Sequence, residues 1–360
     1  MGSIIKLISA LAFLVCIVLV SWTSCLAVPG KHTSGVSSIQ TYRDIPGITN
    51  EEINAIEALK ASRRFFSYGT MFSAEAFVSQ DGFTYSGFTP KLRALLADLF
   101  EVPFIQEIHS RADLIAGFNN YHIDFTGELI SSADRRKAYY MTSALGQRPL
   151  NVLFYTGKRT IEKTDDLIGL KVGFLAGTII EHAVRDIYRN LSFTSVNIQT
   201  DQEALDKLLS GELDVFVTDS PGAFFFRGYT QISNVNILPL VYVPVAMATA
   251  NPDLEPIISV VNKYLDAGGI RIINNLHKEG SNDFLAYEFA QLFSYTEKEY
   301  INTLLENGQK VPVALEHDHY PFSFFNDADN DFQGIVPDIL EEFTKLTGIE
   351  FEVVSDRSSA

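Results

Sequence analysis

Apolar residues recur along most of this chain with two spacings, that of short buried strands and that of amphipathic helices. Ile53, Ile56 and Leu59 fall on one face of a helix, and Thr49 with Glu52 forms a capping box at its start. Short apolar strands alternating with such helices build a mostly parallel sheet that is covered on both faces. The pattern therefore predicts an α/β fold.

Further elements are predicted between residues 89 and 217. The first is a helix that begins at Thr89-Pro90, with Pro at its first position, and buries Leu92, Leu95, Leu96 and Leu99. A strand from Val172 to Leu175 follows, and then a helix opened by Gly177-Thr178 with an apolar face of Ile180, Ala183, Val184 and Ile187. The last two are a helix that is capped by Thr200 and Glu203, buries Leu205, Leu208 and Leu209 and stops at Gly211, and an alternating strand from Leu213 to Val217.

The first apolar stretch has the pattern of an export signal. Leu7 to Trp22 are almost continuously apolar, Lys6 precedes them, and small residues follow. Cleavage after Ala27 is the favoured interpretation, an uncleaved membrane anchor is the alternative, and lipidation of Cys25 is the weakest of the three. We assign residues 1–28 to a signal peptide or N-terminal anchor and 29–64 to a linker with a short helix. In either case Lys6 directs the rest of the chain outside the cytoplasm.

Composition and charge narrow the function classes. Of 360 residues, 46% are hydrophobic and 20% are charged, which excludes a disordered chain and allows a sizeable core. The formal net charge of -16 repels phosphate backbones, so nucleic-acid binding is not expected. Cys16 and Cys25 are the two cysteines and both lie near the export segment, so neither a disulfide framework nor thiol catalysis is expected.

An internal repeat changes the domain assignment. The segment Gly87-Phe-Thr-Pro-Lys-Leu92 recurs as Gly334-Ile-Val-Pro-Asp-Ile339, and a Phe follows each at the same offset, Phe104 and Phe351. The separation is the size of a whole domain, far longer than a solenoid repeat. We expect one complete domain over residues 65–300, the truncated beginning of a second copy over 309–360, and further protein after Ala360.

Three places carry groups that could bind a ligand. Arg135, Arg136 and Lys137 follow a strand-like segment, so an Arg there can hold a ligand carboxylate at the mouth of a cleft, or can be an ordinary surface cation. Gly177-Thr178 lies between a strand and a helix, where backbone N–H groups and the hydroxyl can bind an anion or simply cap the helix. Asp219 ends a strand, where it can accept an ammonium group or begin a Pro-Gly turn.

No metal, cofactor or catalytic site is predicted. The run Glu316-His-Asp-His319 lacks an identifiable third metal ligand, and the sequence after Asp327 departs from a calcium loop at its sixth and twelfth positions. Phosphate-binding, dinucleotide-binding, zinc-protease and serine-hydrolase motifs are missing from the sequence. A binding module is therefore favoured over an enzyme.

Several short segments in the middle of the chain are informative when they are taken together: Asp124 to Leu129, Ser132 to Lys137, Met141 to Ser143, Asp166 to Gly173, Ala176 to Thr178, Glu203 to Leu205, Leu209 to Gly211 and Asp214 to Asp219. With these segments, residues 65 to 295 resemble the type 2 periplasmic binding protein fold, specifically the polar amino-acid-binding type known as solute-binding family 3 or the Venus flytrap. Their order and spacing fit the family together, which is more specific than any single segment.

The resemblance implies roles for individual residues. Arg135 would clamp a ligand α-carboxylate after the hydroxyl residue Ser132, Gly177 and Thr178 would add donors from the second lobe, and Asp219 would receive the α-ammonium. The segment from Asp124 to Arg135 is one residue shorter than in the family, so Arg136 is the alternative clamp. The family's usual acid after the Gly-aromatic pair is Lys91 here, so an anionic or non-amino-acid ligand is an alternative to an amino acid.

The resemblance also implies the organisation. Each lobe would be an α/β sandwich, the first formed by residues 65–147 and 243–295 and the second by 148–242, closing about hinges near Gln147 and Tyr242. Tandem flytraps resemble the exported sensor region of bacterial receptors of the histidine kinase or diguanylate cyclase type, which attach to the membrane through an N-terminal segment or a downstream helix and can form homodimers. The alternatives are the substrate-binding component of an ABC amino-acid transporter and an enzyme such as a dehydratase on the same fold.

Overall fold

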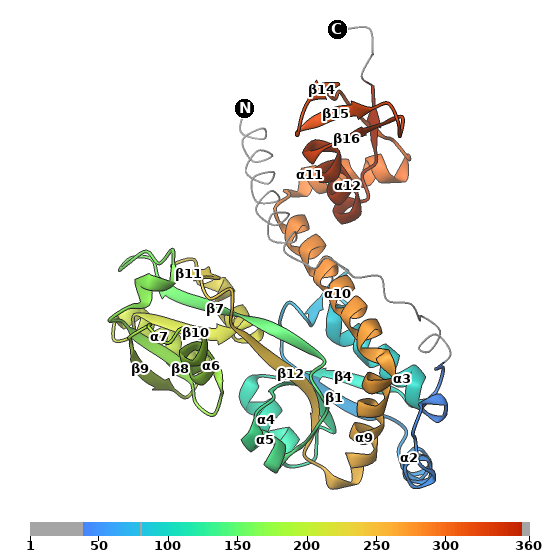
Figure 1. Ribbon diagram of the computed structural model, residues 1–360, viewed down its shortest axis with the longest axis vertical. Coiled ribbons are helices and arrows are strands. Elements are labelled where there is room, and N and C mark those ends of the chain that lie inside the picture. Colours follow the sequence, from blue (N-terminus) through green and yellow to red (C-terminus); the bar gives the residue numbers. More distant parts are fainter. Residues whose placement is uncertain (1–38, 80, 355–360) are drawn as a thin grey trace. The chain divides into compact units, whose positions relative to one another are not determined.

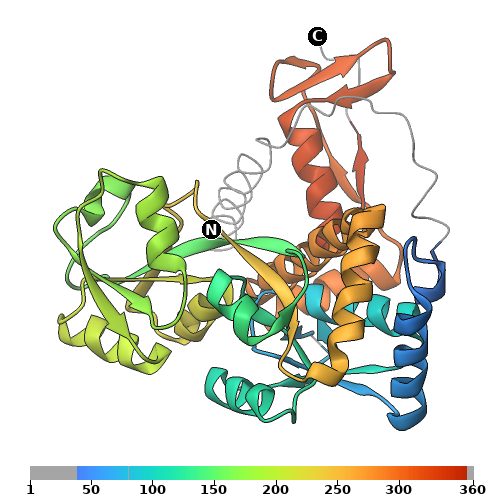
Figure 2. The same ribbon diagram turned by 60° about the horizontal axis from the view of Figure 1, so that its bottom comes forward.

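The computed structural model describes residues 39–79 and 81–354, which form two compact units with their boundary between Phe284 and Leu285 (Figures 1 and 2). The predicted export segment, residues 1–28, lies outside the described residues. Within the described part of the chain, no helix is both long enough and apolar enough to cross a membrane.

The first lobe of the larger unit is built on one side of a pair of long strands. Its sheet contains β1 (Phe66–Thr70), β4 (Phe104–Ile108), β5 (Phe125–Ile130), β6 (Tyr140–Met141) and β12 (Tyr242–Thr249). β1 is parallel to β4 and β5, and β12 runs antiparallel to β5. The other elements are η2 (Tyr42–Asp44), α2 (Asn50–Ser62), the hairpin β2 (Phe77–Val78) and β3 (Tyr85–Ser86), α3 (Phe88–Phe100), α4 (Arg111–Asn119), α5 (Ala133–Ala138), η5 (Pro252–Leu254), α9 (Glu255–Tyr264), the π-helical turn η6 (Leu265–Gly269) and the start of α10 (Ile270–Gln291).

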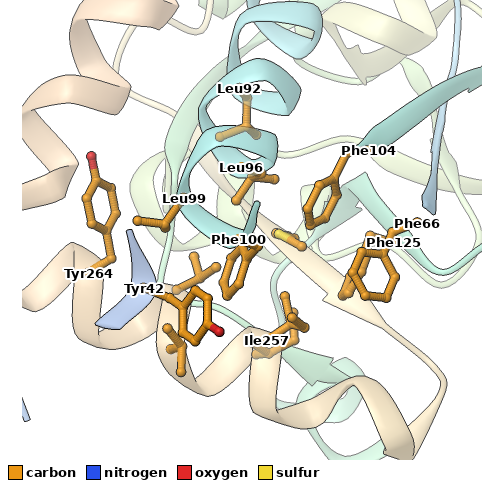
Figure 3. Close-up of a cluster of buried hydrophobic side chains, with 14 of the residues drawn as sticks. Tyr42, Phe66, Leu92, Leu96, Leu99, Phe100, Phe104, Phe125, Ile257 and Tyr264 are labelled. Carbon is orange, nitrogen blue, oxygen red and sulfur yellow. The ribbon is translucent and has the colours of Figure 1, made fainter. Parts of the chain in front are cut away.

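Aromatic and aliphatic side chains from distant segments form the core of this lobe. Figure 3 shows α3 presenting Leu92, Leu96 and Leu99 toward a cluster that includes Phe104 and Ile257. All of these side chains are buried. Removing this much apolar surface from water is the main term that stabilises the lobe.

The second lobe is the green and yellow part of Figure 1. Its strands follow the order β7 (Gly146–Tyr155), β10 (Val215–Asp219), β8 (Lys171–Leu175) and β9 (Thr194–Ile198), and β11 (Ile232–Val235) also pairs with β7. The helices are η3 (Thr164–Leu167), α6 (Ile180–Ile187), α7 (Asp201–Ser210), α8 (Ser220–Phe224) and η4 (Phe225–Gly228). β8 is parallel to both of its neighbours.

Two long antiparallel strands, β7 and β12, join the lobes. Their pairing sets Val243 opposite Arg148 and Pro244 opposite Gln147. β12 also belongs to the sheet of the first lobe and β7 to the sheet of the second. The predicted α/β fold with two lobes is confirmed, and the two crossing strands are the only strand pairing between the lobes in the described residues.

The structure corrects several predicted details. α3 begins at Phe88 instead of having Pro90 at its first position, because Gly87 is the N-cap with φ 109°. α6 begins at Ile180, two residues after Thr178. Ile187 and Leu209 are exposed rather than buried, since each lies in the last turn of its helix. β10 is buried on both faces rather than alternating, because Val215 and Val217 pack in one apolar cluster and Phe216 packs in another. The capping boxes of α2 and the cap of α7 at Thr200 are confirmed.

The smaller unit contains a β–α–β arrangement that repeats one in the first lobe. It comprises α11 (Tyr295–Glu306), β13 (Val311–Val313), β14 (Asp318–His319), β15 (Ser323–Asn326), β16 (Asp331–Gln333), α12 (Ile335–Thr347) and β17 (Phe351–Val353). β13 pairs in parallel with β17 across α12, as β1 does with β4 across α3. Gly334 caps α12 with φ 122°, just as Gly87 caps α3. The repeated sequence thus folds into a repeated local structure.

Candidate functional site

A buried arginine lies where the lobes join. Arg148 is on β7, opposite Val243 of β12, and is 2% exposed. Its Nε donates to Glu75 Oε1 at 2.7 Å and its Nη2 to Glu75 Oε2 at 2.6 Å, a bidentate pair. Nη2 also donates to Glu128 Oε2 at 3.1 Å, and Nη1 donates to Asp219 Oδ2 at 3.3 Å. One guanidinium therefore holds three carboxylates.

The three carboxylates come from both lobes. Glu75 follows β1 and Glu128 is on β5, both in the first lobe, whereas Asp219 is the last residue of β10 in the second. Glu128 Oε1 also accepts the Thr70 hydroxyl at 2.6 Å and the backbone N–H of Met71 at 3.2 Å. We call Arg148, Glu75, Glu128 and Asp219 the Arg148 cluster. It links the lobes through side chains as β7 and β12 do through the backbone.

The ion pairs keep the central groups charged although they are buried. Burial lowers the pKa of Arg148, but the charges of Glu75 and Glu128 outweigh it and raise that pKa well above its ordinary value. Burial likewise raises the pKa of Glu75, and the Arg148 charge with its hydrogen bonds outweighs this and lowers the pKa. Removing one partner would leave a buried charge uncompensated, which costs several kcal/mol in proteins, about 3–5 for a buried pair.

Asp219, which the sequence predicts as an acceptor for a ligand ammonium, has two partners within the protein. Its Oδ1 accepts the backbone N–H of Gly222 at 3.4 Å and so caps α8, while Oδ2 takes Arg148. The residue is 4% exposed. The carboxylate predicted to receive a ligand ammonium is therefore paired with a guanidinium of its own chain.

The two candidate clamp arginines differ in their surroundings. Arg135 Nη1 donates to the Ile130 carbonyl at 2.9 Å, and its guanidinium is partly buried beside the charges of Arg111 and Asp219. Burial first, and then Arg111, lower its pKa, while Tyr139 and Asp219 act in the opposite direction. Arg136 donates both Nη groups to the carbonyls of Met141 and Thr142. Among the described residues no carboxylate forms an ion pair with Arg135.

The remaining predicted residues serve local structure. Ser132 is the N-cap of α5, where its Oγ accepts the backbone N–H of Arg135 at 3.2 Å. The Thr178 hydroxyl donates to the Leu175 carbonyl at 2.8 Å, and Gly177 has φ 70° with open space where a Cβ would stand. In the described part of the chain no hydrogen bond joins Thr178 to Arg135 or Asp219.

A second ion pair crosses between the lobes. Arg111, at the start of α4, donates from Nε to Asp201 Oδ2 at 3.1 Å, and Asp201 is the first residue of α7. Both side chains are largely buried, and Asp201 Oδ1 has no hydrogen-bond partner among the described residues. The charge of Arg111 is also one of the causes that lower the pKa of Arg135.

Sequence reasoning missed Arg148, Glu75, Glu128 and the Arg111–Asp201 pair. The one available signal was a charge in apolar surroundings, since Arg148 stands just before the apolar run of β7.

The histidines considered as metal ligands have other partners. His319 Nδ1 contacts Glu316 at 2.7 Å, and His317 packs on Phe325 and Phe332. In the described residues no group of three potential metal ligands comes together.

Comparison with known proteins gives similarity at the level of structure. No family model matches the chain, and no curated protein matches it. Similar solved structures include an ancestral amino acid-binding protein that is a precursor of cyclohexadienyl dehydratase (20% identity, TM-score 0.44, 62% of this chain and 97% of that one). A second is the amino acid ABC transporter substrate-binding protein AbpA from Streptococcus pneumoniae bound to L-arginine (16% identity, TM-score 0.46, 63% of this chain and 98% of that one). A third is a double mutant of the VFT2 domain of BvgS from Bordetella pertussis (16% identity, TM-score 0.47, 65% of this chain and 98% of that one).

Proposed function

We propose that the two-lobed unit binds a small carboxylate-bearing solute between its lobes, on the outer side of the cytoplasmic membrane. The observation that carries this proposal is the partly buried guanidinium of Arg135, which has no carboxylate partner among the described residues and lies beside a second arginine, Arg111. A buried cation is costly unless an anion pairs with it. A solute carboxylate would supply that anion in bidentate geometry.

The proposed contacts of the solute extend to both lobes. Arg135 would clamp the carboxylate from the first lobe, with Ser132 fixing the backbone that carries it. Gly177 and Thr178 would approach from the second lobe, where the backbone N–H groups at the start of α6 favour an anion. The β7–β12 pair, including Gln147 and Tyr242, would act as the hinge about which the lobes close.

The test is calorimetric titration of the full chain with a panel of amino acids and organic acids. We expect at least one acid to bind with micromolar affinity. Arg135→Ala should weaken that acid at least about 30-fold, because truncating one partner of a desolvated charge pair costs 2 kcal/mol or more. The matched control is Arg136→Ala, which removes a neighbouring arginine that is bound to backbone carbonyls and should change affinity less than about threefold. No heat from any acid, or equal effects of the two variants, would refute the proposal.

We further propose that binding serves sensing by a receptor rather than transport. The repeated β–α–β arrangement in residues 311–353 supports this choice, because a tandem of flytraps is an organisation of receptors. In cells, deleting the gene should abolish the response to the acid and leave its uptake rate unchanged. Loss of uptake would instead support the substrate-binding component of a transporter.

A further inference from the structure

We propose that Phe284 of α10 couples the position of the second lobe to the part of the chain that follows residue 284. α10 (Ile270–Gln291) crosses the boundary between the two compact units, and Phe284 is the last residue of the larger one. The coupling acts through the contacts of one aromatic ring, and it does not depend on which solute the lobes bind.

The first lobe holds α10 up to the turn before Phe284. Ile273 is buried in the core of that lobe. Gly280 lies so close to α3 that a Cβ there would stand 2.3 Å from the backbone nitrogen of Phe88. Three residues later, Asp283 pairs with Lys91 of α3 at 3.1 Å. Because packed backbones and side chains of this kind move together, α10 follows the first lobe as far as residue 283.

Phe284 itself contacts both lobes. Its ring centroid lies 5.3 Å from that of Phe77 in β2 of the first lobe, and 6.4 Å from that of Phe224 in α8 of the second. The guanidinium of Arg227, in η4 of the second lobe, lies 5.0 Å from the Phe224 ring and 5.2 Å from the Phe284 ring. Aromatic pairs and cation–π contacts at these distances are attractive. The second lobe therefore contacts α10 through two side chains, Phe224 and Arg227.

These contacts are sensitive to the angle between the lobes. β7 and β12 join the lobes, so a rotation about them moves α8 and η4 relative to α10. Attraction between two rings fades beyond a centroid distance of about 7 Å, and that between a guanidinium and a ring beyond about 6 Å. Since the Phe224 ring already lies at 6.4 Å, a small opening of the lobes is enough to release Phe284 from the second lobe.

The residues of α10 that follow Phe284 belong to the smaller unit. The Phe289 ring packs on that of Phe343 in α12 at 5.2 Å. The helical segment 285–291 is thus supported by Phe284 before it and by Phe289 within it. A helix segment that loses one of its side-chain contacts opens more often. Releasing Phe284 from the second lobe should therefore loosen residues 285–291 and so reach the smaller unit.

The experiment is hydrogen–deuterium exchange of the full chain, measured by mass spectrometry without any solute. Arg227→Gln removes the guanidinium from both rings at an exposed position, so the variant should fold. We expect the amides of residues 285–291 to exchange at least about threefold faster, the scale of one cation–π contact. Phe225→Ala is the matched control, because Phe225 packs on Phe226 and Tyr229 of its own lobe. Unchanged exchange in Arg227→Gln, or an equal change in Phe225→Ala, would overturn the inference.

A combined variant separates coupling from local packing. Arg111→Ala removes the ion pair between the lobes at α4 and α7, so it should speed exchange of residues 285–291 at least about twofold. In a chain that also carries Phe224→Ala and Arg227→Gln, the same change should have no further effect, because the link to the second lobe is already lost. Additive effects, or no effect of Arg111→Ala, would overturn the inference. The outcome is separate from that of the proposed function, since no solute takes part.

Discussion

Arg148 makes four hydrogen bonds to three carboxylates while it is 2% exposed, so one side chain joins groups from both lobes. At this scale the sequence predicted chemistry poorly. Arg135 and Asp219 could be selected because they stand at the ends of recognisable segments. Arg148, Glu75 and Glu128 could not, since the contacts that define them join positions far apart in the chain and no local pattern marks such contacts.

Gly87 offers a residue-scale test of the site's support. Its φ is 109°, and a Cβ there would stand 2.4 Å from the backbone carbonyl oxygen of Glu75, the residue that binds Arg148. Gly87→Ala should therefore lower the free energy of unfolding by more than about 2 kcal/mol, measured by urea titration. Gly82→Ala is the control, because Gly82 also has positive φ but has open space around it, and it should cost about 1 kcal/mol. Equal losses would argue against the steric explanation.

At the scale of elements the periodicity of apolar residues was informative. It predicted α2, α7 and the strand β8 closely because caps and apolar stripes are local signals. It misplaced the start of α3, since Gly87, directly after β3, caps the helix with a positive φ and lies against the backbone of Glu75, a contact between segments that no local pattern marks. It also could not tell that β10 is central in its sheet, because strand order is set by long-range pairing.

The contact between α2 and α9 gives an element-scale prediction with a pH dependence. Lys263 Nζ lies 2.6 Å from Glu52 Oε2, and Ser259 donates to Oε1. Burial raises the pKa of Glu52, but the hydrogen bonds from Lys263, the Thr49 backbone and Ser259 outweigh it and lower that pKa to about 2. A carboxylate whose pKa is lower in the folded chain than in the unfolded chain stabilises the fold at a pH above the unfolded pKa. This stabilisation is lost as pH falls from about 4.5 toward 2.

Glu52→Gln should accordingly destabilise the chain by about 1–2 kcal/mol at pH 7, after allowance for solvent screening. Below pH 4.5 the difference between variant and parent should shrink. Urea titrations at pH 7, 5 and 3.5 measure it. A difference that stays constant over this range would show that the carboxylate charge is not responsible.

At the scale of the whole molecule, the sequence resemblance predicted the two-lobed fold, in which β7 and β12 join the lobes, better than it predicted any other feature. The order of several weak segments along the chain carried that information, although none was specific alone. What resemblance could not provide was the state of the contacts between the lobes. These depend on individual residues such as Arg148, and on the pair of Arg111 with Asp201, which bridges α4 and α7.

The Arg111–Asp201 pair should restrain opening of the lobes. Spin labels at Ala116→Cys and Asp206→Cys, with Cys16 and Cys25 changed to Ser, report the distance between α4 and α7 by pulsed electron spectroscopy. Arg111→Ala should add longer distances to the distribution, because it removes a partly buried pair and leaves Asp201 without a cation. Lys207→Ala, whose ion pair lies within α7, is the control and should change nothing. An unchanged distribution in Arg111→Ala would contradict the prediction.

The most direct test of the central claim is a crystal structure of the chain grown with its tightest-binding acid. The account predicts the solute carboxylate between the lobes, with its oxygens about 2.7–3.0 Å from the Arg135 guanidinium nitrogens, and Arg148 still bound to Asp219. An acid bound elsewhere, or an acid bound between the lobes without contact to the Arg135 guanidinium, would contradict it.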